Sequence, residues 1–426
     1  MIVRCLAPRM TALLALFAVL TFSLAPSPVR ADAASDAAKV DPTAAVNYTK
    51  LAHGIQAARL QDAINKLSDI HYTIPASADG PAVTAYSRVA GTPGGEQAHQ
   101  YVQGQFNQIF GAPNVQAENF TVTTPETRGA SVAAGGRTYA LQPLWPNLVR
   151  TSTLPQRGVD GPLIYAGRGD LRAFRGKTVE GSIVLLDFNC GTQWLNAARL
   201  GALAIIFIEP AQTMRGEAES KFIGIPIAIP RFWMTRADAA ALQSAALTTP
   251  NFKVHLAADN PWMTNQAYNV IGKIPGTDPV LGKQIVVIES YFDSMSIVPT
   301  QAHGAESACG LSTMLELART FKANPPKRTV WFVASGAHFL GLQGIRSYVD
   351  LHLDSWQQPS AGDKFSAWLH HTSVPERSQV MLFSGLDLTS QTGTVGVFYK
   401  GYFYDYREVN VATRAAGIIG LVNMIR

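Results

Sequence analysis

Side chains with metal-binding or acid–base chemistry follow several apolar runs in the second half of the chain. Tyr291 and Asp293 end the run IVVIESYFDS, and His338 follows the run TVWFVAS. Asp387 comes after VMLFSG, and Glu306 lies in HGAESACG, just before an expected helix. Ligands gather at the carboxyl ends of parallel strands, so these side chains form one pocket if their strands are neighbours.

Carboxylates and an imidazole are common ligands of hard or borderline cations, so one hypothesis for this cluster is a metal site. The plainer interpretation is that Asp293 and Glu306 cap a turn and a helix start. A single histidine such as His338 is often a structural residue with satisfied hydrogen bonds. The spacing alone leaves both interpretations open.

Nucleophilic catalysis has less support. Cys309, near the start of an expected helix, could pair with His338, but a cysteine at such a position is more often a small buried residue. No G-x-S-x-G elbow follows a strand. Cys190 and Cys309 fall in different expected domains, so we expect two free or buried thiols rather than a disulfide.

The composition is typical of a globular protein, and the first residues are typical of an export signal. The chain has 426 residues, which suits two or three domains, and its formal charge of +5 includes no dense basic stripe, so nucleic acid is not an expected partner. Arg4 and Arg9 precede the apolar run TALLALFAVLTFSLA, which is short for a membrane span. Residues 1–33 are therefore interpreted as a signal peptide, with an uncleaved anchor as the alternative, and the mature protein as secreted or periplasmic.

The periodicity of apolar residues predicts an α/β protein with a smaller β-rich part in the middle. Helical spacing is expected over 42–70 and 96–110, and alternation predicts a strand over 115–123. Short β-rich runs fill 144–259, with short helices expected at 196–200 and 237–245. After 267, strands expected at 285–289, 330–334 and 380–383 alternate with helices at 310–323 and 341–353, which predicts a mostly parallel mixed sheet sandwiched by helices.

Several motifs, in order along the chain, resemble the secreted di-zinc aminopeptidases, a family that also includes glutamate carboxypeptidase and the non-catalytic transferrin receptor and nicastrin. The motifs are YSRVAGTPGGEQAHQYV, NVIGKIPGTDPVLGKQIVVIESYFDS, GAESACGLSTMLELARTF and PPKRTVWFVASGAHFLGLQGIRSYV. The middle part resembles the protease-associated domain that many members carry as an insertion. The resemblance thus implies a signal peptide at 1–33, a peptidase-like domain over 34–140 and 260–426, and a protease-associated domain over 141–259.

The resemblance also implies that the metal site is degenerate. Tyr291 stands where the family has a histidine ligand, while Asp293 keeps the place of the aspartate that orients that ligand. Glu306 corresponds to the bridging aspartate. The family's paired glutamates, one a general base and one a ligand, correspond to His338 and Phe339, so His338 is the candidate at the general-base position.

Asp387 matches the next aspartate ligand, but no histidine follows His371 to supply the last one. A weak oxygen-only set of Tyr291, Glu306 and Asp387 would bind zinc poorly, so zinc at reduced occupancy or none is expected. The chain also stops at Arg426, earlier than the family's domain, which indicates a fragment or a trimmed sheet closed by a helix expected over 409–425.

Three functional hypotheses follow from the resemblance. The first is an exported member of the family with impaired or absent peptidase activity and a residual peptide-binding cleft, a pseudoenzyme. The second is an active metallo-exopeptidase, an aminopeptidase with a divergent and single-metal site. The third is a non-catalytic interaction protein that binds a partner through the protease-associated domain. A peptide or protein is the expected substrate or ligand in each case.

Overall fold

The computed structural model describes residues 54–147, 149–222, 227–352 and 380–388. The signal peptide predicted at 1–33, the first part of the helix predicted over 42–70 and the helix predicted over 409–425 lie outside these residues. Within them, no helix is both long enough and apolar enough to cross a membrane.

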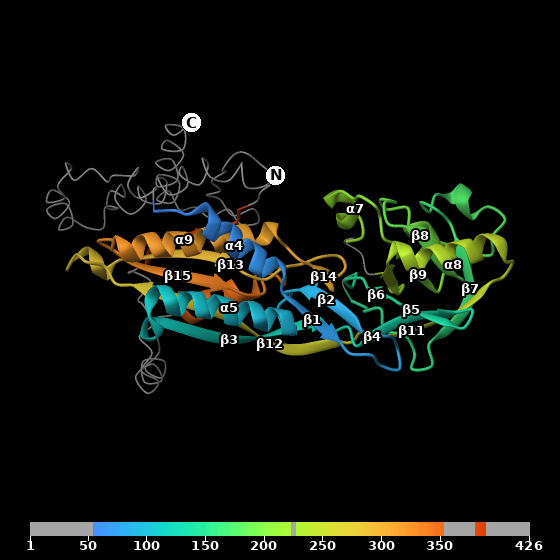
Figure 1. Cartoon of the computed structure of the whole chain (residues 1–426), viewed down its shortest axis with the longest axis horizontal. Coiled ribbons are helices and arrows are strands. Elements are labelled where there is room, and N and C mark those ends of the chain that lie inside the picture. Colours follow the sequence, from blue (N-terminus) through green and yellow to red (C-terminus); the bar gives the residue numbers. More distant parts are fainter. Residues whose placement is uncertain (1–53, 148, 223–226, 353–379, 389–426) are drawn as a thin grey trace.

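The described residues form an elongated molecule of two lobes (Figure 1). The first lobe contains a three-stranded sheet of order β1-β2-β14 and a five-stranded sheet of order β16-β13-β15-β12-β3. Its main elements are α4 (Ala57–Ser68), β1 (His71–Ile74), β2 (Val83–Ser87), α5 (Pro93–Phe110), β3 (Val115–Pro125), β12 (Trp262–Ile274), β13 (Ile285–Tyr291), β14 (Gln301–Ala302), the 3-10 turn η4 (Glu306–Ala308), α9 (Cys309–Ala323), β15 (Thr329–Ser335), α10 (Gln343–His352) and β16 (Val380–Gly385).

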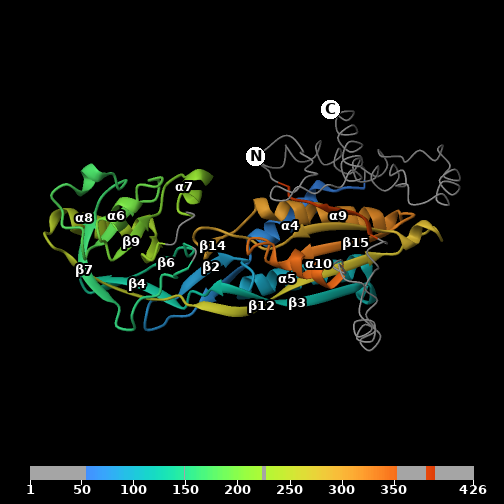
Figure 2. The same cartoon turned by 180° about the vertical axis from the view of Figure 1, so that it is seen from behind.

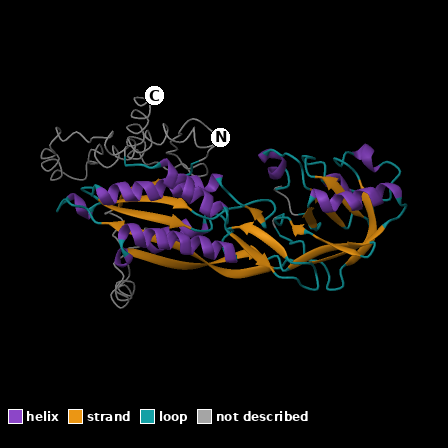
Figure 3. Ribbon diagram, in the orientation of Figure 1, coloured by secondary structure: helices purple, strands orange, loops and turns teal. Residues whose placement is uncertain are grey.

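Helices cover both faces of the five-stranded sheet, which confirms the expected α/β character: α4, α5 and α9 lie on one face (Figure 3), and α10 lies on the other (Figure 2). On β13, Val286 and Ile288 point to one face and pack with α4, α5 and α9, whereas Ile285 and Val287 point to the other and pack with Tyr348 of α10. Strands covered on both faces need apolar residues at consecutive positions, which explains the continuous hydrophobic run. The strands and helices expected after residue 267 are all present within a residue or two of their predicted ends.

The strand directions make the described sheet a mixed one, in which β12 runs against the other four strands. β13 runs parallel to both β15 and β16, but β12 is antiparallel to β15 and to β3. The β3–β12 pair extends from Val115↔Gly272 to Trp262↔Pro125. The chain leaves the first lobe along β3 and returns along β12, so the two strands must oppose each other (Figure 2).

The second lobe contains an eight-stranded sheet of order β5-β4-β11-β7-β8-β9-β10-β6, in which β7 to β10 are parallel neighbours. This sheet begins at Gly129, before the boundary expected at residue 141. Cys190 of this lobe and Cys309 of the first are both free and buried, as predicted. Its elements are β4 (Gly129–Ala134), β5 (Arg137–Ala140), β6 (Gln142–Pro143), β7 (Val159–Tyr165), β8 (Ile183–Asp187), α6 (Leu195–Arg199), β9 (Ala204–Ile208), α7 (Arg215–Glu219), β10 (Arg231–Met234), α8 (Arg236–Thr248) and β11 (Lys253–Asp259).

The two lobes are joined by more than the β3–β12 ribbon. The backbone N–H of Trp145 donates to the carbonyl of Ile297 at 2.7 Å, and Thr300 hydrogen-bonds to Gln142. Ile297 and Val298, from the first lobe's loop after β13, are buried in a cluster of second-lobe side chains. Apolar burial across the junction therefore helps to fix the lobes relative to each other.

The close packing of α5 on the sheet yields a stability prediction. A methyl group at Gly272 of β12 would lie 2.2 Å from a ring carbon of Phe110. We expect Gly272→Ala to lower the free energy of unfolding by about 1–3 kcal/mol, measured by urea denaturation, because overpacking forces the ring or the strand to move. Gly104→Ala on α5 is the control: its Cβ meets no atom within 4 Å, and we expect a gain of about 0.5–1 kcal/mol. Equal effects of the two substitutions would contradict the packing argument.

Candidate functional site

The candidate site is built by the ends of three neighbouring parallel strands. Tyr291, the last residue of β13, is in register with Ser335, the last residue of β15. On the other side of β13, Glu289 is in register with Gly385, the last residue of β16. The strand ends that the sequence predicts to converge therefore lie together at one edge of the sheet.

Tyr291 is the centre of this site, and it contacts Asp387, His338 and Phe339. Its hydroxyl donates a hydrogen bond to Oδ1 of Asp387 at 2.8 Å. Its ring stacks on the imidazole of His338, with centroids 3.7 Å apart and an interplanar angle of 20°, and meets the ring of Phe339 edge-on at 5.5 Å. Burial, together with the bond to Asp387, raises the pKa of Tyr291, so the hydroxyl keeps its proton.

Asp293 holds the turn that carries His338 and Phe339. Asp293 is 1% exposed, and its carboxylate accepts hydrogen bonds from the backbone N–H groups of His338 at 3.0 Å and Phe339 at 3.5 Å. In the same turn Ala337 has φ 54°, a left-handed conformation that a residue with a side chain adopts at a cost. Asp293 is therefore a positioning residue that acts on the backbone of this turn. Burial raises the pKa of Asp293 to about 6.

His338 presents a neutral ring to the site. Burial lowers the pKa of its imidazole below the ordinary value, and Asp387 opposes this shift with a smaller effect. The ring is half-buried and packs against both Tyr291 and Phe339. A neutral imidazole can accept a proton, so the chemistry of a general base is retained at this position.

Glu306 is the first residue of η4. The loop around it is connected to the end of β13 by hydrogen bonds from the buried side chain of Arg88. Arg88 is fully buried and donates to the carbonyls of Phe292 at 2.7 Å and Gly304 at 2.6 Å, and to Oγ of Ser307 at 2.8 Å. Burial lowers the pKa of Arg88 to about 10. The sequence interpretation missed this arginine, although it lies in the first motif, YSRVAGTPGG.

Glu289 is a second residue that the sequence interpretation missed. Ser335 donates from Oγ to Oε1 of Glu289 at 2.5 Å, and burial raises the pKa of Glu289 to about 7. Glu289 and Tyr291 are two positions apart on β13 and so point to the same face of the sheet. The signal that could have revealed it is a carboxylate inside an otherwise apolar strand.

Comparison with known proteins finds a sequence-family profile that matches the part of the chain carrying this site. Residues 269–397 match the sequence profile of Peptidase family M28, and this range includes all five predicted site residues. A curated relative is Aminopeptidase YwaD from Bacillus subtilis, which is 26% identical over 302 residues. That match covers 69% of this chain and 60% of the relative's own length.

Solved structures show a partial likeness. A zinc aminopeptidase from Bacillus subtilis matches with a TM-score of 0.48 and 20% identity, covering 80% of this chain and 81% of that one. An aminopeptidase from Aneurinibacillus sp. strain AM-1 matches with a TM-score of 0.39 and 22% identity, covering 69% and 66%. The peptidase M28 precursor from Shewanella amazonensis has a TM-score of 0.47 and 16% identity over 81% and 83%.

The resemblance of the sequence motifs to di-zinc aminopeptidases implies zinc, so the fit of zinc to this site needs a test. A zinc site needs several nitrogen, sulfur or carboxylate ligands directed at one point. Here the protonated hydroxyl of Tyr291 already occupies one oxygen of Asp387, and Phe339 has no ligand atom. In the part of the chain that the structure describes, no three His, Cys, Asp or Glu side chains are grouped so that they could hold a metal ion. The described donor set does not fit a pair of zinc ions.

The raised pKa of Glu289 predicts a pH-dependent stability. Folding raises this pKa from 4.5 to about 7. The associated stabilisation is therefore fully present below about pH 4.5 and is lost as the pH rises through about 7. We expect Glu289→Gln, which keeps an acceptor for Ser335, to remove up to about 3 kcal/mol of this fall in the free energy of unfolding. Urea denaturation at about pH 5 and about pH 8 measures it, and identical pH profiles of the two proteins would contradict the assignment.

Proposed function

We propose that this chain is an exported protein of the M28 peptidase scaffold whose peptidase activity is impaired or absent and whose cleft retains peptide-binding groups. The match of residues 269–397 to Peptidase family M28 supports the scaffold. The observation that carries the loss of activity is the contact of Tyr291 with Asp387 and His338. The proposal includes the signal peptide at residues 1–33 and the assignment of the second lobe as an inserted protease-associated domain.

The chemistry of two-metal hydrolysis explains why this contact matters. Such enzymes hold two metal ions about 3.5–4 Å apart, so that both stabilise the oxygens of the transition state. The ring of Tyr291 occupies the space between the end of β13 and Asp387, and its hydroxyl donates a hydrogen bond to the carboxylate that would otherwise be free to bind a metal ion. His338 can still accept a proton, but a general base without an activated water or a polarised carbonyl contributes only part of the rate enhancement.

The same groups are suited to hold a peptide without cleaving it. His338 and Asp387 offer hydrogen-bonding groups, and the rings of Tyr291 and Phe339 offer apolar surface. On the second lobe, the exposed Arg215 of α7 is ion-paired with Glu219 at 2.6 Å, which is the main reason that its pKa is raised, and Glu306 and Tyr291 of the first lobe add smaller effects. Figure 1 shows α7 on the side of the second lobe that faces the first.

The first test combines metal analysis with an activity assay on the purified full chain. We expect no stoichiometric zinc by mass spectrometry and no chelator-sensitive hydrolysis of a panel of aminoacyl arylamides, because the described ligands do not converge. About two zinc ions per chain with chelator-sensitive turnover would refute the proposal. About one zinc ion with turnover would establish instead the single-metal exopeptidase, with Glu306 and Asp387 as the first ligands to substitute.

A substitution at Tyr291 tests whether this residue is what excludes the metal. Tyr291→His places a nitrogen ligand beside Asp387, and we expect zinc to bind about tenfold or more tightly than to the unsubstituted protein. Competition with a chromophoric chelator measures the affinity.

Tyr291→Phe is the matched control for that experiment. It frees the carboxylate of Asp387 without adding a ligand, so we expect it to bind zinc as weakly as the unsubstituted protein. An equal gain in both variants would show that the hydrogen bond, and not the missing nitrogen, excludes the metal. No gain in either would show that Tyr291 is not the residue that prevents binding.

A further inference from the structure

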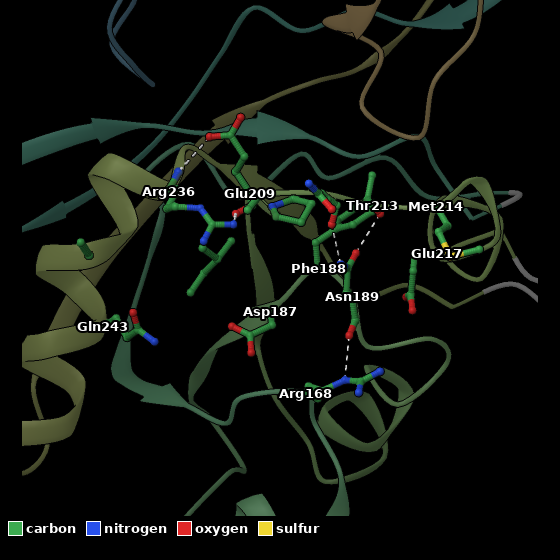
Figure 4. A pocket seen from close by; sticks show the side chains of 15 residues that line it. Arg168, Asp187, Phe188, Asn189, Glu209, Thr213, Met214, Glu217, Arg236 and Gln243 are labelled. Atoms are coloured by element: carbon green, nitrogen blue, oxygen red, sulfur yellow. Dashed lines mark hydrogen bonds between the residues drawn. The ribbon is translucent and has the colours of Figure 1, made fainter.

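A separate pocket of about 960 Å³ lies in the second lobe, away from the site described above. It is formed at the carboxyl ends of the parallel strands β8 and β9 and at the start of α8, which follows β10. This is the edge at which parallel α/β sheets bind ligands, and the volume is within the range of pockets for small molecules. Figure 4 shows its lining residues.

The pocket carries ionised groups of both signs. Its carboxylates are Asp187, Glu209 and Glu217, and its guanidinium groups are Arg168 and Arg236. Glu217 is already paired with the fully buried Lys221, whose Nζ lies 3.3 Å away. The charges of the remaining four groups cancel, so the pocket favours a ligand that is itself neutral overall but carries both charges.

Asp187 is the acidic group best placed to receive a ligand cation. It ends β8, is half-buried, and accepts one hydrogen bond from the hydroxyl of Tyr165 at 3.1 Å. Among the described residues, no lysine, arginine or histidine nitrogen lies within ion-pair distance of this carboxylate. A partly buried carboxylate without a cation partner is favourable only with solvent or a ligand ammonium group beside it.

The two arginines are held at the pocket by hydrogen bonds to backbone carbonyls. Arg236 donates from Nη2 to the carbonyl of Glu209 at 2.9 Å, and Arg168 donates from Nε to the carbonyl of Asn189 at 2.9 Å. These bonds to backbone orient both guanidinium groups, and no acidic side chain pairs with either group among the described residues. An oriented guanidinium binds a carboxylate well because its donors match the two oxygens.

Apolar side chains separate the charged groups. Phe188 and Ile208 are buried at the pocket base, and Met214 is 78% exposed at its rim. We propose that this pocket binds a free amino acid or short peptide as a zwitterion, with its ammonium group on Asp187, its carboxylate on Arg236 and an apolar side chain against Phe188 and Ile208. This assignment is independent of whether the first lobe is active.

The experiment is calorimetric titration of the full chain with the dipeptide alanyl-leucine and with two derivatives. N-acetylation removes the ammonium group, and C-terminal amidation removes the carboxylate. We expect each derivative to bind about tenfold or more weakly than the free dipeptide, because each loses a charge-assisted hydrogen bond. Equal binding of all three, or no binding at millimolar concentration, would overturn the proposal.

Two variants assign the charged contacts to particular residues. Asp187→Asn, which retains an acceptor for Tyr165, is expected to weaken binding of the free dipeptide about tenfold but to leave the acetylated derivative unchanged. Arg236→Gln is expected to weaken the free dipeptide and leave the amidated derivative unchanged. If a variant lost the same amount of affinity for the free dipeptide and for both derivatives, this assignment would be contradicted. Asp160→Asn is the matched control, since this side chain is 77% exposed at the opposite end of β7, and it should change nothing.

Hydrogen exchange locates the bound dipeptide. We expect protection of backbone amides within 187–190 and 209–213 when the dipeptide is present. Protection confined to residues 291–293 and 335–339 would place the ligand in the first lobe and overturn this inference, while supporting peptide binding by the site proposed there. The two proposals therefore fail independently.

Discussion

Three parallel strands, β16, β13 and β15, end at one edge of the first lobe's sheet, and their register decides which side chains meet there. Tyr291 is paired with Ser335, and Glu289 with Gly385. A shift of one residue would turn Tyr291 to the opposite face of the sheet and separate it from Asp387. The register therefore determines the chemistry of this edge, and the apolar core on both faces of β13 holds it.

Buried cations stabilise the loops around the sheet edges in both lobes. Arg88 binds carbonyls from the end of β13 and from the loop before η4, while Arg231 in the second lobe binds the carbonyls of Lys221 at 2.6 Å and Trp145 at 2.8 Å. A buried charge is costly without partners, so these hydrogen bonds are what allow it. The same hydrogen bonds satisfy carbonyl groups of the loops and hold these loops in one conformation.

The two lobes use the same edge of a parallel sheet in different ways. In the first lobe, the polar groups at the strand ends contact one another, with Tyr291 bonded to Asp387 and stacked on His338. In the second, Asp187 and Arg236 line a space large enough for a small ligand. The bond from Tyr291 takes up part of the hydrogen-bonding capacity that Asp387 could offer a ligand, whereas Asp187 and Arg236 face an open pocket.

The sequence by itself determined strands β3, β13, β15 and β16, helices α5, α9 and α10, and the polar residues that follow the last three strands, because these depend on local apolar periodicity. It also identified Tyr291 and Phe339 as unusual residues in the M28-like motifs. Only the tertiary structure decided that Tyr291 bonds to Asp387, a residue 96 positions away, and that Arg88 ties the Glu306 loop to β13. It likewise decided that β3 and β12 run antiparallel and that a pocket opens beside Asp187. These features come from contacts between distant segments, and local propensity carries no information about which segments will meet.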